Sequence, residues 1–426
     1  MSDPSPPSLR ALAAASFKIG CLGFGGPAGQ IALMHRVFVE ERKWIDEARY
    51  LHALNYCMLL PGPEAQQLAT YVGWLLRGVR GGVIAGALFV IPGALIVFGL
   101  SWLYVLHGQT PLVASLFVGV KAAVLGFIID ALARIGRRAL KGRIDVAIAL
   151  AAFAALFVFG APFPLVILAA ALLGAFLTSP APAEIPLAVT APPASRAFAS
   201  AAIWGAAWLA PVGAVLVFFG PQHVLAQVSL LFSQLAIVTF GGAYAVLAYL
   251  QQQAVDVHAW LTPAQMIDGL GLAETTPGPL ILVNQFVGFL AGWGEGGLGL
   301  AIAAAALASW CTFAPSFVWI FAGAPYAEHL RRNRFAAGAL RAVTAAVLGV
   351  IASLALWFAL HVLFAQNTRI ATPWGRILDA PLLASFNWAS AAIAVLAAIA
   401  LIRFKANAVL VVLASAAAGW AAHALL

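Results

Sequence analysis

Two Gly- and Pro-rich motifs interrupt long apolar segments, and a helix that restarts after such a break can bind an anion. Glycine weakens a helix, and proline suits the first turn of a new one. The backbone N–H groups at the start of the new helix lack a helical partner and carry a partial positive charge, which favours a negative ligand. The first motif is Phe24, Gly25, Gly26 and Pro27, and the second is Pro61, Gly62 and Pro63, followed by Glu64, Ala65 and Gln66. The simpler interpretations are close helix packing at the first motif and a plain kink at the second.

Both motifs recur in the second half of the chain, in the same order. The second copies are Phe240, Gly241 and Gly242, and then Pro277, Gly278 and Pro279, each 216 residues after the first copy (24 to 240 and 61 to 277). The run Ala-Ala-Val-Leu-Gly at 122–126 also recurs, at 345–349. Side chains that can form hydrogen bonds flank the second Pro-Gly-Pro, namely Thr275, Thr276, Asn284 and Gln285. Matches in a fixed order indicate an internal repeat.

The few charged residues inside apolar segments are the other candidates, because such residues are costly in a membrane and are usually functional. Lys18 and Lys121 are fixed positive charges that could compensate a dianion. They could instead reach the lipid headgroups or pair with Asp130 or Glu64. Glu64 begins a half-helix, and Glu274 lies three residues before the second Pro-Gly-Pro. Either carboxyl group could couple transport to protons, and an ionised Glu64 could simply cap its helix.

The composition requires a membrane protein. The 426 residues include 23 Lys+Arg and 15 Asp+Glu, so only 9% are charged, whereas 63% are hydrophobic. The mean hydropathy is +0.97. Because soluble chains carry about 25% charged residues, this composition excludes a soluble enzyme, a nucleic-acid-binding domain and a disordered scaffold. The sequence has no nucleotide-binding, nucleophile or His/Cys ligand motif, so neither catalysis, nor a cofactor, nor a metal site is expected.

The apolar segments predict an all-α polytopic membrane protein of about thirteen transmembrane helices, each of about 20 residues. If the N-terminus is cytoplasmic and each Pro-Gly-Pro segment crosses the membrane once, the main Arg and Lys clusters are all cytoplasmic. Re-entrant hairpins at these motifs would divide the clusters between the two faces. The predicted parts are a disordered tail at 1–9, a first repeat at 10–178, a linker at 179–199, a central transmembrane helix at 200–219 and a second repeat at 222–426. The central helix inverts the second repeat, and inverted repeats with broken helices are typical of secondary transporters.

The motifs resemble those of the chromate ion transporter family. The resemblance is carried by FKIGCLGFGGPAGQ, ERKWID, LLPGPEAQQLATYVG and VGVKAAVLG in the first half, and by TFGGAYAVL, LAETTPGPLILVNQFVGF and RAVTAAVLGVI in the second. It extends over residues 10–426 and implies a carrier of the bacterial inner membrane that exports chromate and confers resistance to it. Sulfate, an anion of nearly the same size and charge, is implied as competitor or counter-substrate. The family's functional motifs correspond to Phe24 to Pro27 and Pro61 to Gln66.

The residues and the resemblance together favour alternating access around an oxyanion site, driven by the proton gradient or by sulfate exchange. A sulfate or other oxyanion permease, a passive anion channel and a structural membrane protein are the alternatives. The expected partners are a chromate- or sulfate-like oxyanion and membrane lipids. A homodimer is compatible with the sequence, and nucleic acid is not expected. The C-terminus is expected in the periplasm, and the mixed-charge segment at 35–50 is interpreted as an interfacial helix or, alternatively, as a gate.

Overall fold

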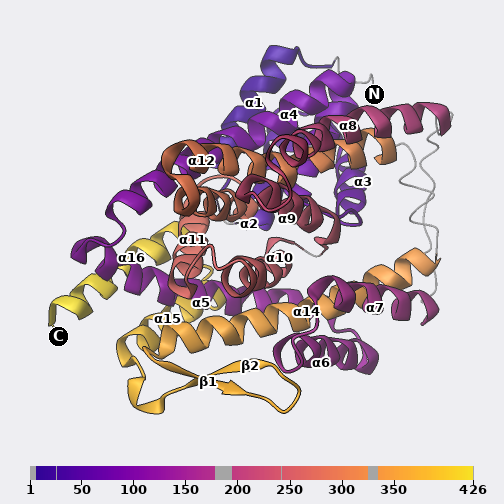
Figure 1. The fold of residues 1–426 in the computed structure, drawn as a ribbon. Helices are drawn as coiled ribbons and strands as arrows, with labels where there is room; N and C mark the ends of the chain where they lie inside the picture. The colour runs from indigo at the N-terminus through magenta and orange to yellow at the C-terminus, as the bar shows by residue number, and fades with distance from the viewer. Residues whose placement is uncertain (1–5, 25, 178–193, 241, 325–333, 426) are drawn as a thin grey trace. The chain divides into compact units, whose positions relative to one another are not determined.

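The computed structural model describes residues 6–24, 26–177, 194–240, 242–324 and 334–425, which are mostly helical (Figure 1). The chain divides into two compact units, a first unit of Met1–Ser101, Pro180–Gly242 and Thr276–Arg334, and a second unit of Trp102–Ser179, Ala243–Thr275 and Phe335–Leu426. The elements of the first unit are α1 (Leu9–Leu22), α2 (Gly26–His35), the π-helix η1 (Arg36–Glu41), α3 (Glu47–Cys57), α4 (Glu64–His107, as far as Ser101), α8 (Ala194–Phe219), α9 (Val224–Val238), the 3-10 helix η3 (Leu280–Leu282), α12 (Val283–Val318) and the π-helix η4 (Trp319–Gly323). Those of the second unit are α5 (Pro111–Ala139), α6 (Arg143–Phe157), α7 (Phe163–Phe176), α10 (Ala243–Gln251), the π-helix η2 (Gln252–Val257), α11 (Pro263–Thr275), α14 (Arg334–Leu363), β1 (Asn367–Ala371), β2 (Ile377–Pro381), the 3-10 helix η6 (Leu383–Ser385), α15 (Trp388–Ile402) and α16 (Ala408–Leu425).

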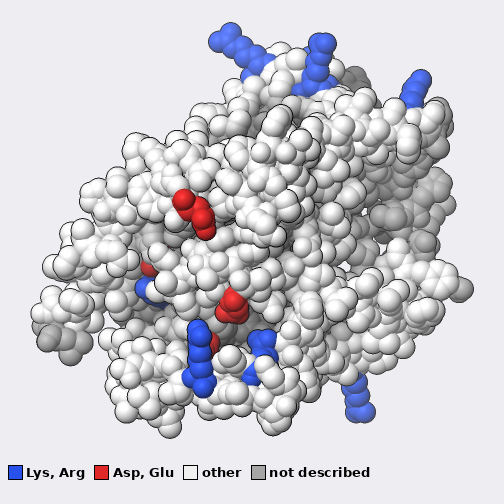
Figure 2. Space-filling view, in the orientation of Figure 1, with Lys and Arg blue, Asp and Glu red and all other residues white. Residues whose placement is uncertain are grey.

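Five helical stretches in the described part of the chain are long and apolar enough to cross a membrane. They are Glu64–His107, Pro111–Ala139, Ser195–Phe219, Leu280–Gly323 and Phe335–Leu363. The shorter apolar helices α7, α9, α15 and α16 accompany them. Charged side chains are sparse on the face of the molecule that Figure 2 shows. These features are those of a largely helical, multi-pass membrane protein.

Two of the five stretches contain a kink at a glycine and are therefore two consecutive helices. The backbone of α4 leaves the helical conformation at Arg77 and Gly78, and that of α12 does so at Gly296 and Gly297. Gly78 has φ +61° and Gly297 has φ +70°, in the left-handed region that residues with a Cβ rarely adopt. Each kink separates a half-helix that follows a Pro-Gly-Pro motif from a longer apolar helix, as the predicted segments required.

Two predicted boundaries are wrong. The predicted disordered tail at 1–9 is ordered from residue 6, because Arg77 donates hydrogen bonds to the carbonyl oxygens of Pro6 and Pro7. Ser8 then caps α1, its Oγ accepting from Ala11 N at 3.1 Å. The central helix begins at Ala194 instead of residue 200, since no helix breaker follows the two prolines before it. The rest of the predicted linker, 179–193, lies outside the described residues.

A β-hairpin follows α14 and was not predicted. Its strands β1 and β2 are antiparallel, with Asn367 opposite Pro381 and Ala371 opposite Ile377. Gly375 turns the chain with φ +82°. In the same unit, Trp374 Nε1 donates to the carbonyl oxygen of Val158 at 2.9 Å, which ties the hairpin to the loop between α6 and α7. The all-α expectation is therefore incomplete by one short hairpin.

In the second unit, the long helix of each repeat packs against the final helices of the other repeat. The glycine of the first Ala-Ala-Val-Leu-Gly run, Gly126, faces α15, where an added Cβ would lie 3.0 Å from the Cβ of Ala397. The glycine of the second run, Gly349, faces α6, where an added Cβ would collide with the carbonyl oxygen of Ala149. The recurring glycine therefore permits a close helix crossing between the two repeats.

Candidate functional site

In the first unit, the two kinds of break bind each other through the backbone. Gly278 N, in the second Pro-Gly-Pro, donates to the carbonyl oxygen of Gly23, directly before the first Phe-Gly-Gly, at 3.0 Å. Gly62 N, in the first Pro-Gly-Pro, donates to the carbonyl oxygen of Thr239, directly before the second Phe-Gly-Gly, at 2.9 Å. The two bonds are related by the repeat spacing, since 23 plus 216 is 239 and 62 plus 216 is 278. We call the two Phe-Gly-Gly segments, with the residue before each, and the two Pro-Gly-Pro segments the break loops; they are residues 23–26, 61–63, 239–242 and 277–279.

Glycine is required in the break loops because their backbone turns through positive φ. Gly62 has φ +112° and Gly278 has φ +106°, and Gly26 and Gly242 have φ +66° and +98°. A residue with a Cβ is strained in these conformations. Of the other predicted residues, Phe24 lies in the loop between α1 and α2, and Pro27 lies in the first turn of α2. Gly25 and Gly241 lie outside the described residues.

Gln30 joins two of the break loops and was not predicted as a site residue. Its side chain is fully buried. Its Nε2 donates to the carbonyl oxygens of Gly23 at 3.2 Å and Gly278 at 2.6 Å. The signal in the sequence was a lone glutamine one turn after Pro27 in an apolar helix. Gln30 thus holds the first Phe-Gly-Gly break against the second Pro-Gly-Pro.

After the first Pro-Gly-Pro, α4 begins at Glu64 and buries two adjacent glutamines. Gln67 Nε2 donates to the carbonyl oxygen of Pro61 at 2.7 Å, which closes the loop on its own helix. Gln66 Nε2 lies 3.4 Å from Thr70 Oγ1, and both side chains are fully buried. The predicted Pro63 and Ala65 are buried beside them. Glu64 is partly exposed in the first turn of the helix.

After the second Pro-Gly-Pro, the polar side chains bind neighbouring helices. Asn284 Nδ2 donates to Thr312 Oγ1 at 3.0 Å, and Gln285 Nε2 donates to the carbonyl oxygen of Ala94 at 2.8 Å. The predicted Thr276, Pro277 and Pro279 are buried in the loop itself. Thr275 is the last residue of α11, in the second unit, and its hydroxyl donates to carbonyl oxygens of its own helix.

Several buried polar atoms of the first unit have no hydrogen-bond partner. They are Ser16 Oγ, Gln30 Oε1, Gln66 Oε1, Gln67 Oε1, Asn284 Oδ1, Ser316 Oγ and Trp319 Nε1. Three of them belong to glutamines that hold or follow a break loop, and an added Cβ on Gly62 would lie 3.8 Å from Ser316 Oγ. An unpartnered buried polar group costs about 1–3 kcal/mol, and such groups mark places where a ligand or water binds. The region of the break loops thus contains buried polar atoms that form no hydrogen bond within the protein.

The two intramembrane lysines differ from their predicted environment. Lys18 is exposed, because α1 buries the face that carries Leu12 and Ile19, so the expectation of a buried cation is wrong there. Lys121, in the second unit, is partly buried, and its Nζ lies 3.3 Å from Asp268 Oδ1. Asp268, which was not predicted as a site residue, is therefore the partner of Lys121. Its signal was an acidic residue within the apolar segment 262–292.

The predicted alternative, in which an intramembrane lysine pairs with Asp130, is wrong. Asp130 binds Arg134, one turn further along α5, at 2.8 Å. Glu274 is 6% exposed and accepts a hydrogen bond from the hydroxyl of Tyr244. Arg134 and Asp130 act on Glu274 electrostatically in the same unit. Glu64 belongs to the first unit, so the two proton-coupling candidates lie in different units.

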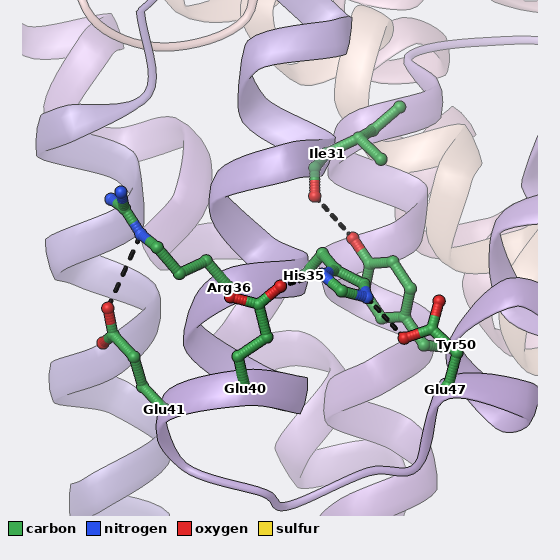
Figure 3. Close-up of polar contacts among 7 residues, drawn as sticks. All are labelled: Ile31, His35, Arg36, Glu40, Glu41, Glu47 and Tyr50. Carbon is green, nitrogen blue, oxygen red and sulfur yellow. Dashed lines mark hydrogen bonds and ion pairs between the residues drawn. The ribbon is translucent and has the colours of Figure 1, made fainter.

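The mixed-charge segment at 35–50 forms a turn between α2 and α3 around His35 (Figure 3). His35 Nδ1 lies 3.1 Å from Glu40 Oε1, and Nε2 lies 2.6 Å from Glu47 Oε2. Tyr50 Oη donates to the carbonyl oxygen of Ile31 at 2.6 Å. The two carboxylates are 59% and 56% exposed, so these contacts fasten a surface turn. No cluster of three His, Cys, Asp or Glu that could hold a metal ion occurs among the described residues.

Comparison with known proteins agrees with the motifs. Residues 10–175 and 226–420 match the family described as chromate transporter. The chain is 31% identical over 425 residues to the chromate transport protein of Pseudomonas aeruginosa, covering 98% of this chain and 93% of that protein. It is 29% identical to the chromate transport protein of Cupriavidus metallidurans, covering 82% and 86%, and 29% identical to the probable chromate transport protein of Synechococcus elongatus, covering 81% and 83%. No solved structure matches the chain. The family match, which extends over both halves and contains all four break loops, shows that this chain belongs to the chromate transporter family.

Proposed function

We propose that this chain is a secondary active transporter that carries chromate, a tetrahedral oxyanion, out of the cell across the bacterial inner membrane and so confers resistance to chromate. Its family and the names of its relatives support the substrate. The observation that carries the proposal is the pair of backbone hydrogen bonds that joins the break loops of the two repeats, Gly278 N to Gly23 O and Gly62 N to Thr239 O.

These bonds support a carrier because breaks at membrane depth need partners. Backbone groups that leave a helix cost several kcal/mol each in lipid, so broken helices are found where they contact protein or line a wet site. In inverted-repeat transporters, half-helix N-termini at such a site bind the anionic groups of the substrate. Here the helices that follow Pro63 and Pro279 begin at the break loops. We assign oxyanion binding to the N–H groups of these two helix starts.

The proposed topology has about thirteen crossings, with a cytoplasmic N-terminus and a periplasmic C-terminus. Contacts within the second unit support part of it. Arg341, in the first turns of α14, donates to Asp145 Oδ1 and Oδ2 at 3.0 and 2.9 Å. Asp145 lies in the first turn of α6, directly after the basic loop of Lys141 and Arg143. The starts of α6 and α14 therefore lie at one end of that unit, as a shared cytoplasmic face requires.

The energy source in this proposal is the proton gradient or exchange with external sulfate. Glu64 and Glu274 are the proposed proton-binding groups, one in each unit. Glu274 is supported by its burial and by its hydrogen bond from Tyr244, because a buried carboxyl group without a full counter-charge readily exchanges a proton. A sulfate permease and a passive anion channel are the outcomes that would replace this proposal.

Flux measurements in proteoliposomes test the proposal. Chromate flux should saturate and should be accelerated by sulfate on the opposite face or by a pH gradient. Linear flux without counter-transport would identify a channel, sulfate flux without chromate flux would identify a sulfate permease, and absence of both would contradict a carrier. Gly278→Ala should reduce flux strongly, whereas Gly213→Ala on α8, where an added Cβ meets no atom within 4 Å, is the matched control and should not.

A further inference from the structure

The second unit contains a buried acid that the proposed function has not used. Asp268, on α11, faces Lys121, on α5, with Oδ1 and Nζ 3.3 Å apart. Tyr104, near the end of α4, donates its hydroxyl to Asp268 Oδ2 at 2.8 Å. The side chain of Asp268 is 7% exposed and that of Lys121 is 25% exposed. The Asp268 carboxylate is thus buried between Lys121 and Tyr104, whereas the Lys121 side chain remains partly accessible.

The ionised pair leaves no net charge for an incoming oxyanion. A dianion that approached Lys121 would share one ammonium group with the Asp268 carboxylate, and two anions on one cation repel strongly where water is scarce. Protonation of Asp268 removes one of the anions. Lys121 then carries an uncompensated positive charge, which a dianion can bind by charge-assisted hydrogen bonds.

We infer that Asp268 is a proton-binding group that releases Lys121 to the transported oxyanion. On binding, the Lys121–Asp268 ion pair is replaced by a Lys121–oxyanion pair, and Asp268 Oδ1 takes one proton from the solvent. On release, the proton leaves and the original ion pair forms again. This inference rests on the sulfate-exchange form of the proposed function. A proton that binds and leaves together with the oxyanion would move out of the cell against an inward proton gradient, whereas it cancels when one oxyanion is exchanged for another. The inference adds a proton-linked binding step at Lys121, within the second unit, to the binding assigned to the helix starts of the first unit.

The surroundings of Asp268 suit such a link. The titratable groups that face its carboxylate are Lys121 from α5 and Tyr104 from α4. α16 also packs against α11, and its one titratable side chain, His423, is exposed near the end of that helix. Glu274, further along α11, binds Tyr244 instead. Because the Tyr104 hydroxyl donates to the carboxylate, it stabilises the ionised form and sets the pH at which Lys121 is released.

Calorimetric titration of the full-length chain in detergent tests the link. Sulfate and chromate are titrated in two buffers of different ionisation enthalpy, which counts the protons taken up. Sulfate is the cleaner probe because it stays a dianion over the pH range. The wild type should take up about one proton per oxyanion, and its affinity should fall about tenfold per pH unit where Asp268 is ionised. Asp268→Asn should bind without proton uptake and independently of pH, and Lys121→Met should lose the proton-linked binding.

Two further variants separate this link from a structural ion pair. Asp145→Asn breaks a different ion pair of the second unit, with Arg341, and should lower stability while leaving proton uptake unchanged. Tyr104→Phe keeps both charges and should move the fall in affinity to higher pH by about one unit, the effect of one hydrogen bond to a charged group, so it tests the link even if Asp268→Asn does not fold. Unchanged proton uptake in Asp268→Asn, or none in a wild type that binds oxyanion, would overturn the inference. A wild type that neither binds nor transports oxyanion would contradict the proposed function itself.

Discussion

The central glycines of the two Pro-Gly-Pro motifs allow a quantitative test of the break loops. Gly62 and Gly278 have nearly equal φ angles, +112° and +106°, so an alanine at either position is strained by about 1–3 kcal/mol. Their surroundings differ. An added Cβ on Gly62 would lie 2.9 Å from Gln67 Nε2, the end of a flexible side chain, whereas one on Gly278 would lie 3.0 Å from Gly93 Cα and 3.1 Å from Leu282 Cδ1.

Gly278→Ala should therefore lower the free energy of unfolding more than Gly62→Ala does. At Gly278 the extra methyl group would press against the backbone of Gly93, which costs a further penalty of about 1–3 kcal/mol. At Gly62 it would press against the end of the Gln67 side chain, which can move away. Gly242→Ala supplies the control for strain alone, because Gly242 has φ +98° and an added Cβ there meets no atom within 4 Å. The expected order of destabilisation is Gly278→Ala, then Gly62→Ala, then Gly242→Ala.

Unfolding in mixed micelles, titrated with SDS and followed by circular dichroism, measures this order. A difference of about 1–3 kcal/mol between Gly278→Ala and Gly242→Ala would support the contacts of the second loop. If Gly62→Ala destabilises as much as Gly278→Ala, the backbone of Gly93 is not the obstacle. If all three variants are as stable as the wild type, the positive φ angles of the break loops are wrong.

Three other predictions follow from the charged residues. Lys18→Met should leave oxyanion flux and its half-saturating concentration unchanged, because Lys18 is exposed; a clear rise in that concentration would show that it binds substrate. Arg341→Met should lower the free energy of unfolding by about 1–3 kcal/mol, because it removes the hydrogen bonds of a half-exposed guanidinium group to the carboxylate of Asp145, which is 2% exposed; SDS titration should detect this loss, and no measurable effect would mean that Asp145 is hydrated. Glu47→Gln should cost at most about 1 kcal/mol despite its short contact with His35, since its side chain is 56% exposed; a larger loss in the same titration would contradict a surface role.

The breaks were predictable because local sequence imposes them, whereas the pairing of each Phe-Gly-Gly break with the Pro-Gly-Pro break of the other half was not predicted. Gly26, Gly62, Gly242 and Gly278 all adopt positive φ, and the Pro-Gly-Pro spacing alone specifies where a helix must end and restart. The equal spacing of the motifs also predicts that corresponding residues of the two halves adopt similar backbone conformations, as Gly62 and Gly278 do. The largely helical, membrane-spanning character of the chain follows from its apolar segments.

The positions of the charges were not predictable in the same way. Lys18 and Ile19 are neighbours in sequence, yet Ile19 is buried and Lys18 is exposed, because burial depends on how α1 is rotated against its neighbours. The pairing of Lys121 with Asp268 joins residues far apart in the chain, and although the acidic residue stands out in its apolar segment, the sequence does not show which cation it faces. Gln30 stands out as a lone glutamine in an apolar helix, but its partners are backbone carbonyl groups, so no second residue type in the sequence points to its contacts.

In the second unit, the packing of α5 from the first half of the chain against α15 and α16 from the second half has a consequence for biosynthesis. α5 is made early, whereas α15 and α16, against which Gly126 and Gly119 pack, follow much later in the chain. Until then, the small residues on that side of α5 have only lipid or a membrane chaperone as neighbours. Such long-range contacts form slowly. Assembly of the second unit therefore waits until α15 and α16 have been made, and a nascent chain that stops before Trp388 lacks these partners of α5.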